Sequence, residues 1–331
     1  MQMNDRQQSL NQWLTEYFQS SDFTITTASA DASFRAYYRV AFKDNTYIVM
    51  DAPPEYEDCC AFIDITGRLL ACQSNVPEIL HHDKQQGFLL LTDFGDSHYL
   101  ASINTDNADK LYQQAIDSLI QFQLNADCTG LADYDQNLLQ REMDLFPDWF
   151  LQRYLDLQLS EHEKESMADL FKLLIKEATL QSQTFVHRDY HSRNLMLTKA
   201  NSPGILDYQD AVKGPITYDL VSLLKDSYIN WPEDKRLQWV NYYLQQLESK
   251  SPLAFQTDEF IRWFDLMGVQ RELKVAGIFA RLYLRDDKHG YLQHIPPTLH
   301  YILELQDKYP ELDWLCNYLN ETVMPALENK L

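Results

Sequence analysis

The sequence predicts an α+β fold in which a small antiparallel sheet comes first and a larger, mostly helical part follows. In the first part, β-rich runs alternate with short polar turns, at residues 34–42, 46–50, 76–80 and 88–91. From about residue 106 the pattern changes, and apolar side chains recur at three- and four-residue steps. We therefore expect two lobes, 1–95 and 96–331, with a cleft between them.

Composition narrows the class of protein. The 331 residues are enough for two lobes with a shared core. The net charge of −21 argues against a nucleic-acid partner, which would require a basic patch. No apolar run approaches the length of a membrane span, and the polar start is unlike a signal peptide, so we expect a cytoplasmic protein with no membrane partner. The five cysteines have no metal-type spacing. Nothing in the sequence predicts the oligomeric state.

Local patterns place the elements in order. Apolar stripes predict helices over 5–19 and 58–72, and Lys43-Asp44-Asn45 predicts a hairpin turn between the first two β-rich runs. In the second lobe we expect short strands at 195–197 and 205–206, and helices over 137–157, 217–229, 233–248, 257–285 and 297–307.

The most informative stretch runs from Thr184 to Leu220. Asp189 follows a short apolar strand, Asn194 comes soon after it, and Asp207 ends a later strand. One carboxylate to accept a hydroxyl proton, with an amide and a second carboxylate to hold magnesium, is what phosphoryl transfer from ATP requires. The spacing H-x-D-x-x-x-x-N followed by a strand-terminal Asp matches the kinase catalytic loop and its metal-binding aspartate. It predicts a two-lobed, protein-kinase-like fold with Asp189 catalytic, Asn194 and Asp207 as Mg²⁺ ligands, and ATP as cofactor.

Details of the same stretch favour a kinase for small molecules. Protein kinases usually carry Lys two residues after the catalytic Asp, whereas this chain has His191. The distance between Asp207 and Asp219 leaves no room for a long activation loop. The segment from Gly214 to Leu220 resembles the closing motif of aminoglycoside and choline phosphotransferases.

The segments expected to bind ATP depart from the usual kinase sequence pattern. The loop Ala28–Ser33, expected over the phosphates, has no glycine, so its backbone amides and the Ser29 and Ser33 hydroxyls would have to make the contacts. The third strand ends in Asp51 where a phosphate-binding Lys is normal. Arg35 or Arg39 on the preceding strand could supply the missing charge.

A literal Asp-Phe-Gly occurs at Asp93, Phe94 and Gly95, upstream of the catalytic loop. The magnesium aspartate must follow that loop, so we assign the metal role to Asp207. Thr92, Asp93 and Phe94 are instead predicted to form the crossing between the lobes, where the backbone commonly meets the adenine.

A closer resemblance covers most of the chain. The segments DASFRAYYRV, YIVMDAPPE, VHRDYHSRNLM and QRELKVAGIFARLYLRDDKHGYL resemble those of bacterial anomeric kinases of N-acetylmuramate and N-acetylglucosamine, in the aminoglycoside phosphotransferase superfamily. The resemblance implies phosphorylation of the sugar at O1 with ATP and Mg²⁺, in peptidoglycan recycling. It implies that Asp189 orients and deprotonates the anomeric hydroxyl and that Asp219 braces the loop. Arg193 and Asp210 are close enough to the loop in sequence to line the cleft, and the alternative for either residue is a solvated loop charge.

One of the two expected acceptor sugars, N-acetylmuramate, is an anion. N-acetylmuramate carries a lactyl carboxylate, which needs a cation once it is buried. Arg281 shares a helical face with Lys274, Ile278 and Arg285, and we expect Arg281 to contact that carboxylate. Arg285 beside Asp286 could instead be a surface ion pair.

Two other functions stay open from sequence. A phosphotransferase acting on an aminoglycoside or choline would suit the acidic surface, because those substrates are cationic. A non-catalytic pseudokinase is suggested by the absent lysine and glycines, although the intact Asp189, Asn194 and Asp207 weigh against it.

Overall fold

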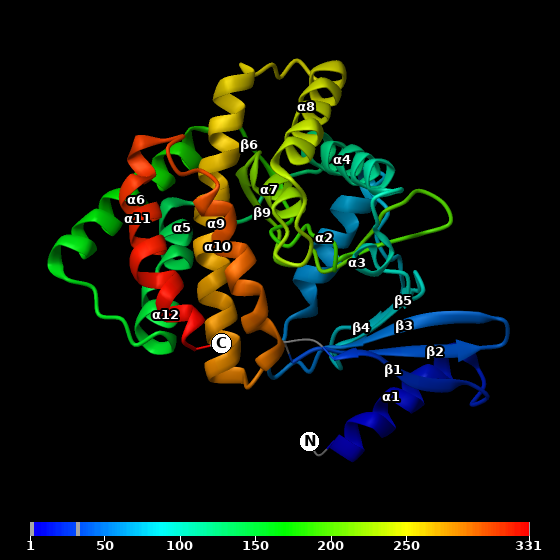
Figure 1. Cartoon of the computed structure of the whole chain (residues 1–331). Helices are drawn as coiled ribbons and strands as arrows, with labels where there is room; N and C mark the ends of the chain where they lie inside the picture. The colour runs from blue at the N-terminus through cyan, green and yellow to red at the C-terminus, as the bar shows by residue number, and fades with distance from the viewer. Residues whose placement is uncertain (1–2, 31–33, 331) are drawn as a thin grey trace. The chain divides into compact units, whose positions relative to one another are not determined.

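The structure, a computed structural model, describes residues 3–30 and 34–330. The chain forms two compact units (Figure 1). The first unit is Met1–Ser97 with Met196–Asp210, and the second unit is His98–Leu195 with Ala211–Leu331. The segment 196–210, which the sequence division assigned to the second lobe, thus belongs with the sheet.

The first unit is built on one antiparallel sheet. Its strands follow the order β1-β2-β3-β5-β4. The elements are α1 (Met3–Phe18), β1 (Thr24–Ala30), β2 (Ala36–Phe42), β3 (Asn45–Asp51), α2 (Cys59–Ala71), β4 (Ile79–Asp83) and β5 (Phe88–Thr92). The apolar stripe of α1, with Leu10 and Leu14, packs on Val40 and Val49 of the sheet. The turn after β2 is made by Lys43 with a φ of 53°.

Hydrogen bonds of Asn75 explain why the segment 196–210 belongs to the first unit. β7 (Leu195–Met196), at the boundary, pairs with β8 (Gly204–Ile205). The backbone N–H of Ile205 donates to the Asn75 carbonyl at 2.8 Å, and the Asn75 side-chain amide donates to the Asn201 carbonyl at 2.7 Å. The ring of Tyr208 stacks on Phe62 of α2, with centroids 5.1 Å apart.

Several expected boundaries were wrong. The expected strand at 76–80 begins at Ile79 and continues through His81, whose ring stacks on Trp13 of α1. The expected loop at 28–33 begins later, because β1 extends to Ala30 and pairs with β2. The expected helix over 137–157 is two elements, with Pro147 at the start of the second. The helix expected over 217–229 is shorter, because α7 ends at Leu224.

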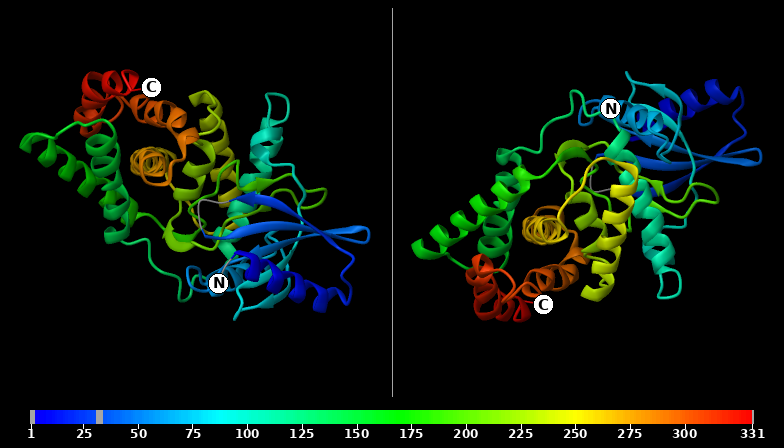
Figure 2. Two further views of the ribbon diagram at one scale, coloured as in Figure 1. Left: turned by 90° about the horizontal axis from the view of Figure 1, so that it is seen from below. Right: turned by 90° about the horizontal axis from the view of Figure 1, so that it is seen from above.

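The second unit is mostly helical and centres on one long helix, α9 (Thr257–Asp286), which Figure 2 shows end-on among the surrounding helices. The other elements are α3 (Tyr99–Ser102), α4 (Ala108–Asn125), α5 (Gln136–Met143), the π-helix η1 (Phe146–Tyr154), α6 (Glu161–Leu180), β6 (Gln183–Val186), β9 (Val212–Pro215), α7 (Tyr218–Leu224), α8 (Glu233–Lys250), η2 (His289–His294), α10 (Ile295–Leu303), η3 (Pro310–Leu312), α11 (Asp313–Tyr318), η4 (Leu319–Val323) and α12 (Met324–Glu328).

A glycine in α9 allows a close helix crossing. A Cβ atom built on Gly277 would lie 2.4 Å from the backbone carbon of Leu145, just before η1. The backbones of α9 and the η1 region therefore touch here without a side chain between them. On either side of this point, the buried residues of α9 pack against η1, α6, α7 and α10.

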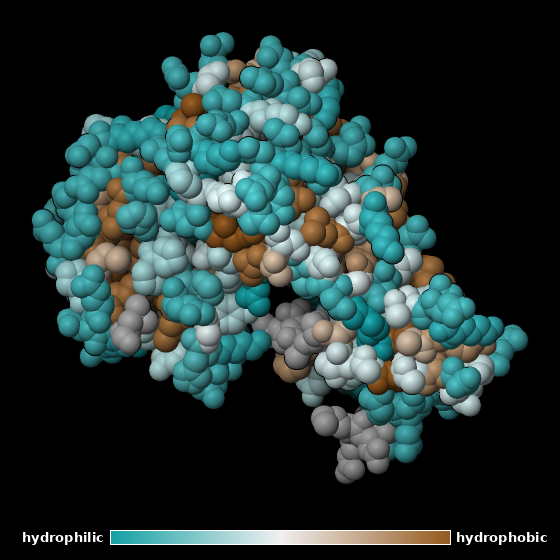
Figure 3. All heavy atoms as spheres, turned by 45° about the vertical axis from the view of Figure 1, so that its right-hand side comes forward, coloured by the Kyte–Doolittle hydropathy of each residue, from teal (hydrophilic) through white to brown (hydrophobic). Residues whose placement is uncertain are grey.

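Hydrophilic side chains cover most of the face seen in Figure 3, with small hydrophobic groups between them. The larger exposed apolar side chains include Phe34 and Tyr56, whose rings stack with centroids 4.7 Å apart. Within the described residues, none of the helices combines the length and the apolar character needed to cross a bilayer.

Candidate active site

The loop that carries Asp189 starts at the end of β6, which pairs antiparallel with β9. Asp219, fully buried at the start of α7, accepts hydrogen bonds from the backbone N–H groups of His187 at 2.7 Å and Arg188 at 3.0 Å. Arg188 has a φ of 78°, a left-handed conformation that is unusual for a side chain of its size. The two bonds to Asp219 thus hold the entry to the loop in a strained shape.

The rest of the loop is fixed by its own hydrogen bonds. The Asn194 side-chain amide donates to the Asp189 carbonyl at 2.9 Å, and the backbone N–H of Asp189 donates to the His187 ring at 3.2 Å. Further along, the backbone N–H of Ser192 donates to the Asp226 carboxylate at 3.0 Å. The structure therefore brings Asp189 and Asn194 together in one braced turn.

Glu142 is a buried residue of this region that sequence reasoning missed. Its carboxylate, at the end of α5, accepts hydrogen bonds from Tyr134 and Arg188, and forms an ion pair with Lys274 of α9 at 3.2 Å. Lys274 also donates to the Tyr218 hydroxyl at 2.8 Å. Burial alone would raise the pKa of Glu142, but the charges of Lys274 and Arg188 more than offset it and hold that pKa below its usual value.

A sequence signal for Glu142 existed. Its neighbours Leu139 and Met143 lie on the buried face of α5, and an acidic residue on that face needs a partner.

The charges of several basic residues act on the Asp189 carboxylate. Burial would raise its pKa, and the Lys274 ammonium, followed by His191 and Arg188, brings that pKa below the ordinary value. Asp189 is consequently held in its anionic form, which is the form that can accept a proton from a hydroxyl group.

Asp207 belongs to the first unit and lies two residues after the end of β8. It has a φ of 63°, and the Gln209 side-chain amide donates to its Oδ1 at 2.8 Å. Among the described residues, no group of three His, Cys, Asp or Glu side chains is placed to hold a metal. Magnesium in nucleotide sites commonly takes one or two protein oxygens plus phosphates and water, and the Asp207 carboxylate and the Asn194 amide oxygen are each, by their chemistry, the type of ligand that Mg²⁺ takes.

The two arginines considered for the missing lysine differ in their partners. Arg35 forms an ion pair with Glu57, just before α2, at 2.9 Å. Burial lowers the pKa of Arg35, but Tyr37, Glu57 and Asp210 raise it more. The lysine position itself is occupied by Asp51, which accepts a hydrogen bond from Arg6 of α1 at 2.7 Å.

Arg39 is bound to the Asp-Phe-Gly turn instead. Its guanidinium donates to Asp93 at 2.7 Å and to the carbonyl of Gly95 at 3.0 Å. Burial would raise the pKa of Asp93, but this arginine holds it below its usual value. Asp93 is therefore the ion-pair partner of Arg39 within the first unit.

The other predicted nucleotide contacts lie in the same unit. Thr92, at the end of β5, accepts the backbone N–H of Glu78 at 3.0 Å. Phe94 packs on Gly204, where an added Cβ would lie 2.6 Å from its ring. Ser29 has its backbone in β1, while its side chain and all of Ser33 lie outside the described residues.

Two arginines of the second unit lack an acidic partner within the part of the chain that the structure describes. Arg193, exposed on the catalytic loop, lies over the ring of Tyr228 at 4.7 Å and that of Tyr291 at 5.8 Å. Arg281 is half-buried, and its Nε is buried without a hydrogen-bond partner. Burial and then the charge of Arg285 lower the pKa of Arg281, whereas Arg285 itself pairs with Asp286 at 2.8 Å.

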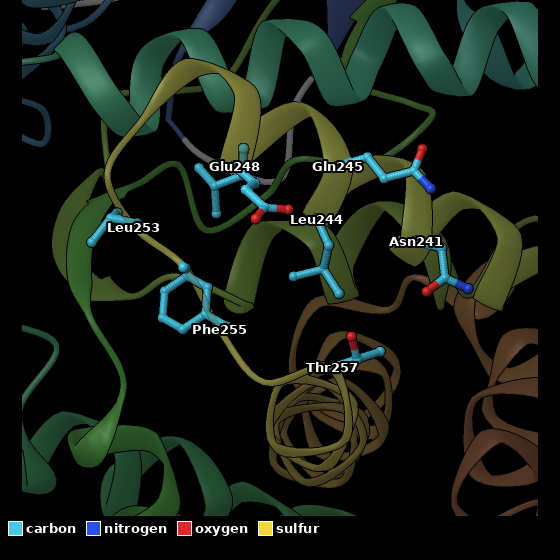
Figure 4. A pocket seen from close by; sticks show the side chains of 9 residues that line it. Asn241, Leu244, Gln245, Glu248, Leu253, Phe255 and Thr257 are labelled. Carbon is cyan, nitrogen blue, oxygen red and sulfur yellow. The ribbon is translucent and has the colours of Figure 1, made fainter.

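A small pocket lies elsewhere in the second unit (Figure 4). Its volume is about 160 Å³, and its walls come from the end of α8, the following loop and the start of α9, including Gln245, Glu248, Phe255 and Thr257. None of the predicted site residues lines it, so it is not the candidate active site.

Comparisons with known proteins show which family the chain belongs to. A model of the phosphotransferase enzyme family matches residues 24–263. The N-acetylmuramate/N-acetylglucosamine kinase of Pseudomonas putida is 44% identical over 290 residues, which cover 87% of this chain and 85% of that protein. The kinase of the same name from Neisseria meningitidis is 39% identical over 324 residues, or 96% of each chain.

Solved structures resemble the chain in fold. An ADP-bound aminoglycoside phosphotransferase has a TM-score of 0.58 at 14% identity, covering 88% of this chain and 97% of its own. A choline kinase from Streptococcus pneumoniae has a TM-score of 0.61 at 10% identity, covering 88% and 98%. These matches confirm the predicted α+β fold, with its antiparallel sheet followed by a mostly helical region. The chain belongs to the phosphotransferase enzyme family.

Proposed function

We propose that this chain transfers a phosphoryl group from ATP to the anomeric hydroxyl of N-acetylmuramate and N-acetylglucosamine, giving the sugar 1-phosphates used in peptidoglycan recycling. The observation that carries the reaction type is the braced, anionic Asp189 with Asn194 bonded to its carbonyl. The similarity to the N-acetylmuramate/N-acetylglucosamine kinases of Pseudomonas putida and Neisseria meningitidis supports the choice of sugars. A reaction that consumes ATP is consistent with a cytoplasmic location.

Each residue has a defined part in this reaction. Asp189 accepts the proton of the attacking hydroxyl and orients it, which contributes through position and proton transfer. Asn194 and Asp207 are the protein ligands of Mg²⁺. The metal, when bound with ATP, neutralises phosphate charge.

The nucleotide contacts come from the first unit. Arg35, whose ion pair with Glu57 resembles the lysine–glutamate pair of other kinases, is the cation we propose for the phosphates. Ser29 and Ser33 contact the phosphates from the preceding loop. Thr92, Asp93 and Phe94 meet the adenine through their backbone.

The acceptor contacts come from Arg193, Asp210 and Arg281. Arg281 is proposed for the lactyl carboxylate of N-acetylmuramate, because its half-buried guanidinium has no acidic partner among the described residues and retains an unsatisfied Nε. A carboxylate would complete its hydrogen bonding with a charge-assisted pair.

Phosphorus NMR of the products tests the proposal. The purified protein is incubated with ATP, Mg²⁺ and each of the two sugars, and the expected product is a sugar 1-phosphate in both reactions. Kanamycin and choline are run in parallel as cationic acceptors. A 6-phosphate product would contradict the assignment of the anomeric hydroxyl. Turnover of kanamycin or choline alone would contradict the assignment of the sugars. If no acceptor led to ADP release, the pseudokinase alternative would be supported.

A further inference from the structure

Lys274 is a lysine in the middle of α9 that is almost entirely buried. Its side chain is 8% exposed, and its ammonium lies 3.2 Å from the Glu142 carboxylate and 2.8 Å from the Tyr218 hydroxyl. Burying a lysine is costly, and a buried lysine that is retained as an ion needs full compensation of its charge. The groups around Lys274 therefore indicate which anion its ammonium stabilises.

Glu142 alone does not provide that compensation. Its single negative charge faces two cations, Lys274 and Arg188, while the third partner, Tyr134, is neutral. One positive charge remains. Glu142 joins Lys274 to Arg188, the residue directly before Asp189, so this positive charge lies next to the catalytic loop. In agreement with this placement, the charges of Lys274 and Arg188 both lower the pKa of the Asp189 carboxyl.

We propose that Lys274 is a positioning residue for the catalytic step, which holds the Asp189 carboxylate in place by charge from α9. Protein kinases carry a lysine two residues after the catalytic Asp. His191 occupies that sequence position here, and the ring Nδ1 of His191 is buried without a hydrogen-bond partner in the described part of the chain. Lys274 thus supplies from a distant helix a cation in place of the lysine that is missing two residues after Asp189.

Glu142 fixes the position of the Lys274 ammonium. By accepting hydrogen bonds from Tyr134 and Arg188, it holds the acceptor atoms for Lys274 in a fixed position at the end of α5. Tyr218 fixes the ammonium from α7, one residue before the Asp219 that braces the loop. Three helices therefore converge on the charge that faces Asp189.

The test compares Lys274→Met, which removes the charge, with Lys274→Arg, which keeps it. The inference rests on the proposed phosphotransferase activity but not on the sugar, so the assay follows ADP release with whichever acceptor the wild type turns over best. Lys274→Met should lower kcat by at least about tenfold, with the KM for ATP within about twofold of wild type. Lys274→Arg should restore kcat to within about fivefold of wild type.

A double-mutant cycle identifies the target of the charge. In an Asp189→Asn background, Lys274→Met should lower the residual kcat by less than about twofold, because the group that it serves is already neutral. The same loss in both backgrounds would overturn the proposal, as would equal losses for the Met and Arg variants.

Lys225→Met is the matched control for removing a buried lysine, since Lys225 pairs with Asp265 at 3.3 Å and is not part of the Glu142 group. Its kcat should stay within about twofold of wild type. If Lys274→Met does not fold, Tyr218→Phe takes its place, because it keeps the charge and removes only the hydrogen bond that orients it. Tyr218→Phe should then lower kcat by about threefold, and an unchanged kcat would overturn the proposal.

Discussion

The buried carboxylate of Asp219 accepts the backbone N–H of Arg188 at 3.0 Å, and Arg188 keeps a left-handed backbone at this bond. Asp219→Ala removes this acceptor and also the carboxylate oxygen that accepts the His187 N–H at 2.7 Å. We expect a loss of about 2–4 kcal/mol in the free energy of unfolding, measured by urea titration, together with a lower kcat. Asp219→Asn, which keeps one oxygen, should lose less. A wild-type urea midpoint for the Ala variant would mean that other contacts hold the loop.

The proposed proton acceptor and metal ligand give a second prediction. Asp189→Asn and Asp207→Ala should each lower kcat by at least about 10²-fold while both variants remain folded, as measured by circular dichroism. Asp93→Ala is the control for choosing the right aspartate, because Asp93 is paired with Arg39. It should mainly reduce stability, by about 1–2 kcal/mol. If Asp93→Ala abolished magnesium-dependent turnover and Asp207→Ala did not, the metal assignment would have to be exchanged.

Arg281 gives a prediction that separates the two sugars. N-acetylglucosamine lacks the lactyl carboxylate, so Arg281→Ala should raise the KM for N-acetylmuramate by about tenfold and leave that for N-acetylglucosamine within about twofold. Arg285→Ala, one turn further along α9 and paired with Asp286, is the control and should change neither KM. Equal increases for both sugars with Arg281→Ala would point to a role in the fold or in nucleotide binding.

Glu272 makes stability depend on pH. It is fully buried on α9 with Arg271 3.0 Å away, and burial raises its pKa to about 7 although the arginine opposes this. Between about pH 4.5 and about pH 7 the folded chain keeps a proton on Glu272 that the unfolded chain has lost. This contribution to stability is therefore present at low pH and disappears as the pH rises through that window.

Glu272→Gln removes this dependence. Compared with the variant, the wild type should lose on the order of 2–3 kcal/mol of unfolding free energy between about pH 5 and about pH 8. Urea titrations of both proteins at the two pH values measure the difference, and groups elsewhere cancel in the comparison. Parallel pH profiles for the two proteins would show that Glu272 stays ionised throughout.

Regular patterns made much of the fold predictable. The helical stripe of α1 and the alternation in β2 and β3 describe faces that pack on one core, so periodicity places them well. β1 was missed because its sequence, TITTASA, is polar, and its strand form depends on pairing with β2.

The catalytic loop was visible because its chemistry needs fixed spacing within a short segment. The charges around it were not, because Glu142 and Lys274 come from helices far apart in the sequence and meet only through the fold. The partner of Arg39 was missed for the same reason, since the Asp-Phe-Gly turn reaches it across the sheet.

With the acceptor contacts proposed on α9, the close crossing at Gly277 would limit how this family member could change its substrate during evolution. Because the backbone of α9 already rests on the carbonyl of Leu145, the helix has no side chain there that could be shortened or lengthened to shift it. Lys274 lies one turn before Gly277 and Arg281 one turn after it. Because the crossing fixes the position of α9 along its axis relative to Leu145, it also fixes the positions of these two residues. A change in acceptor size would consequently have to arise from the side chains on that face, and the helix that carries them would stay where it is.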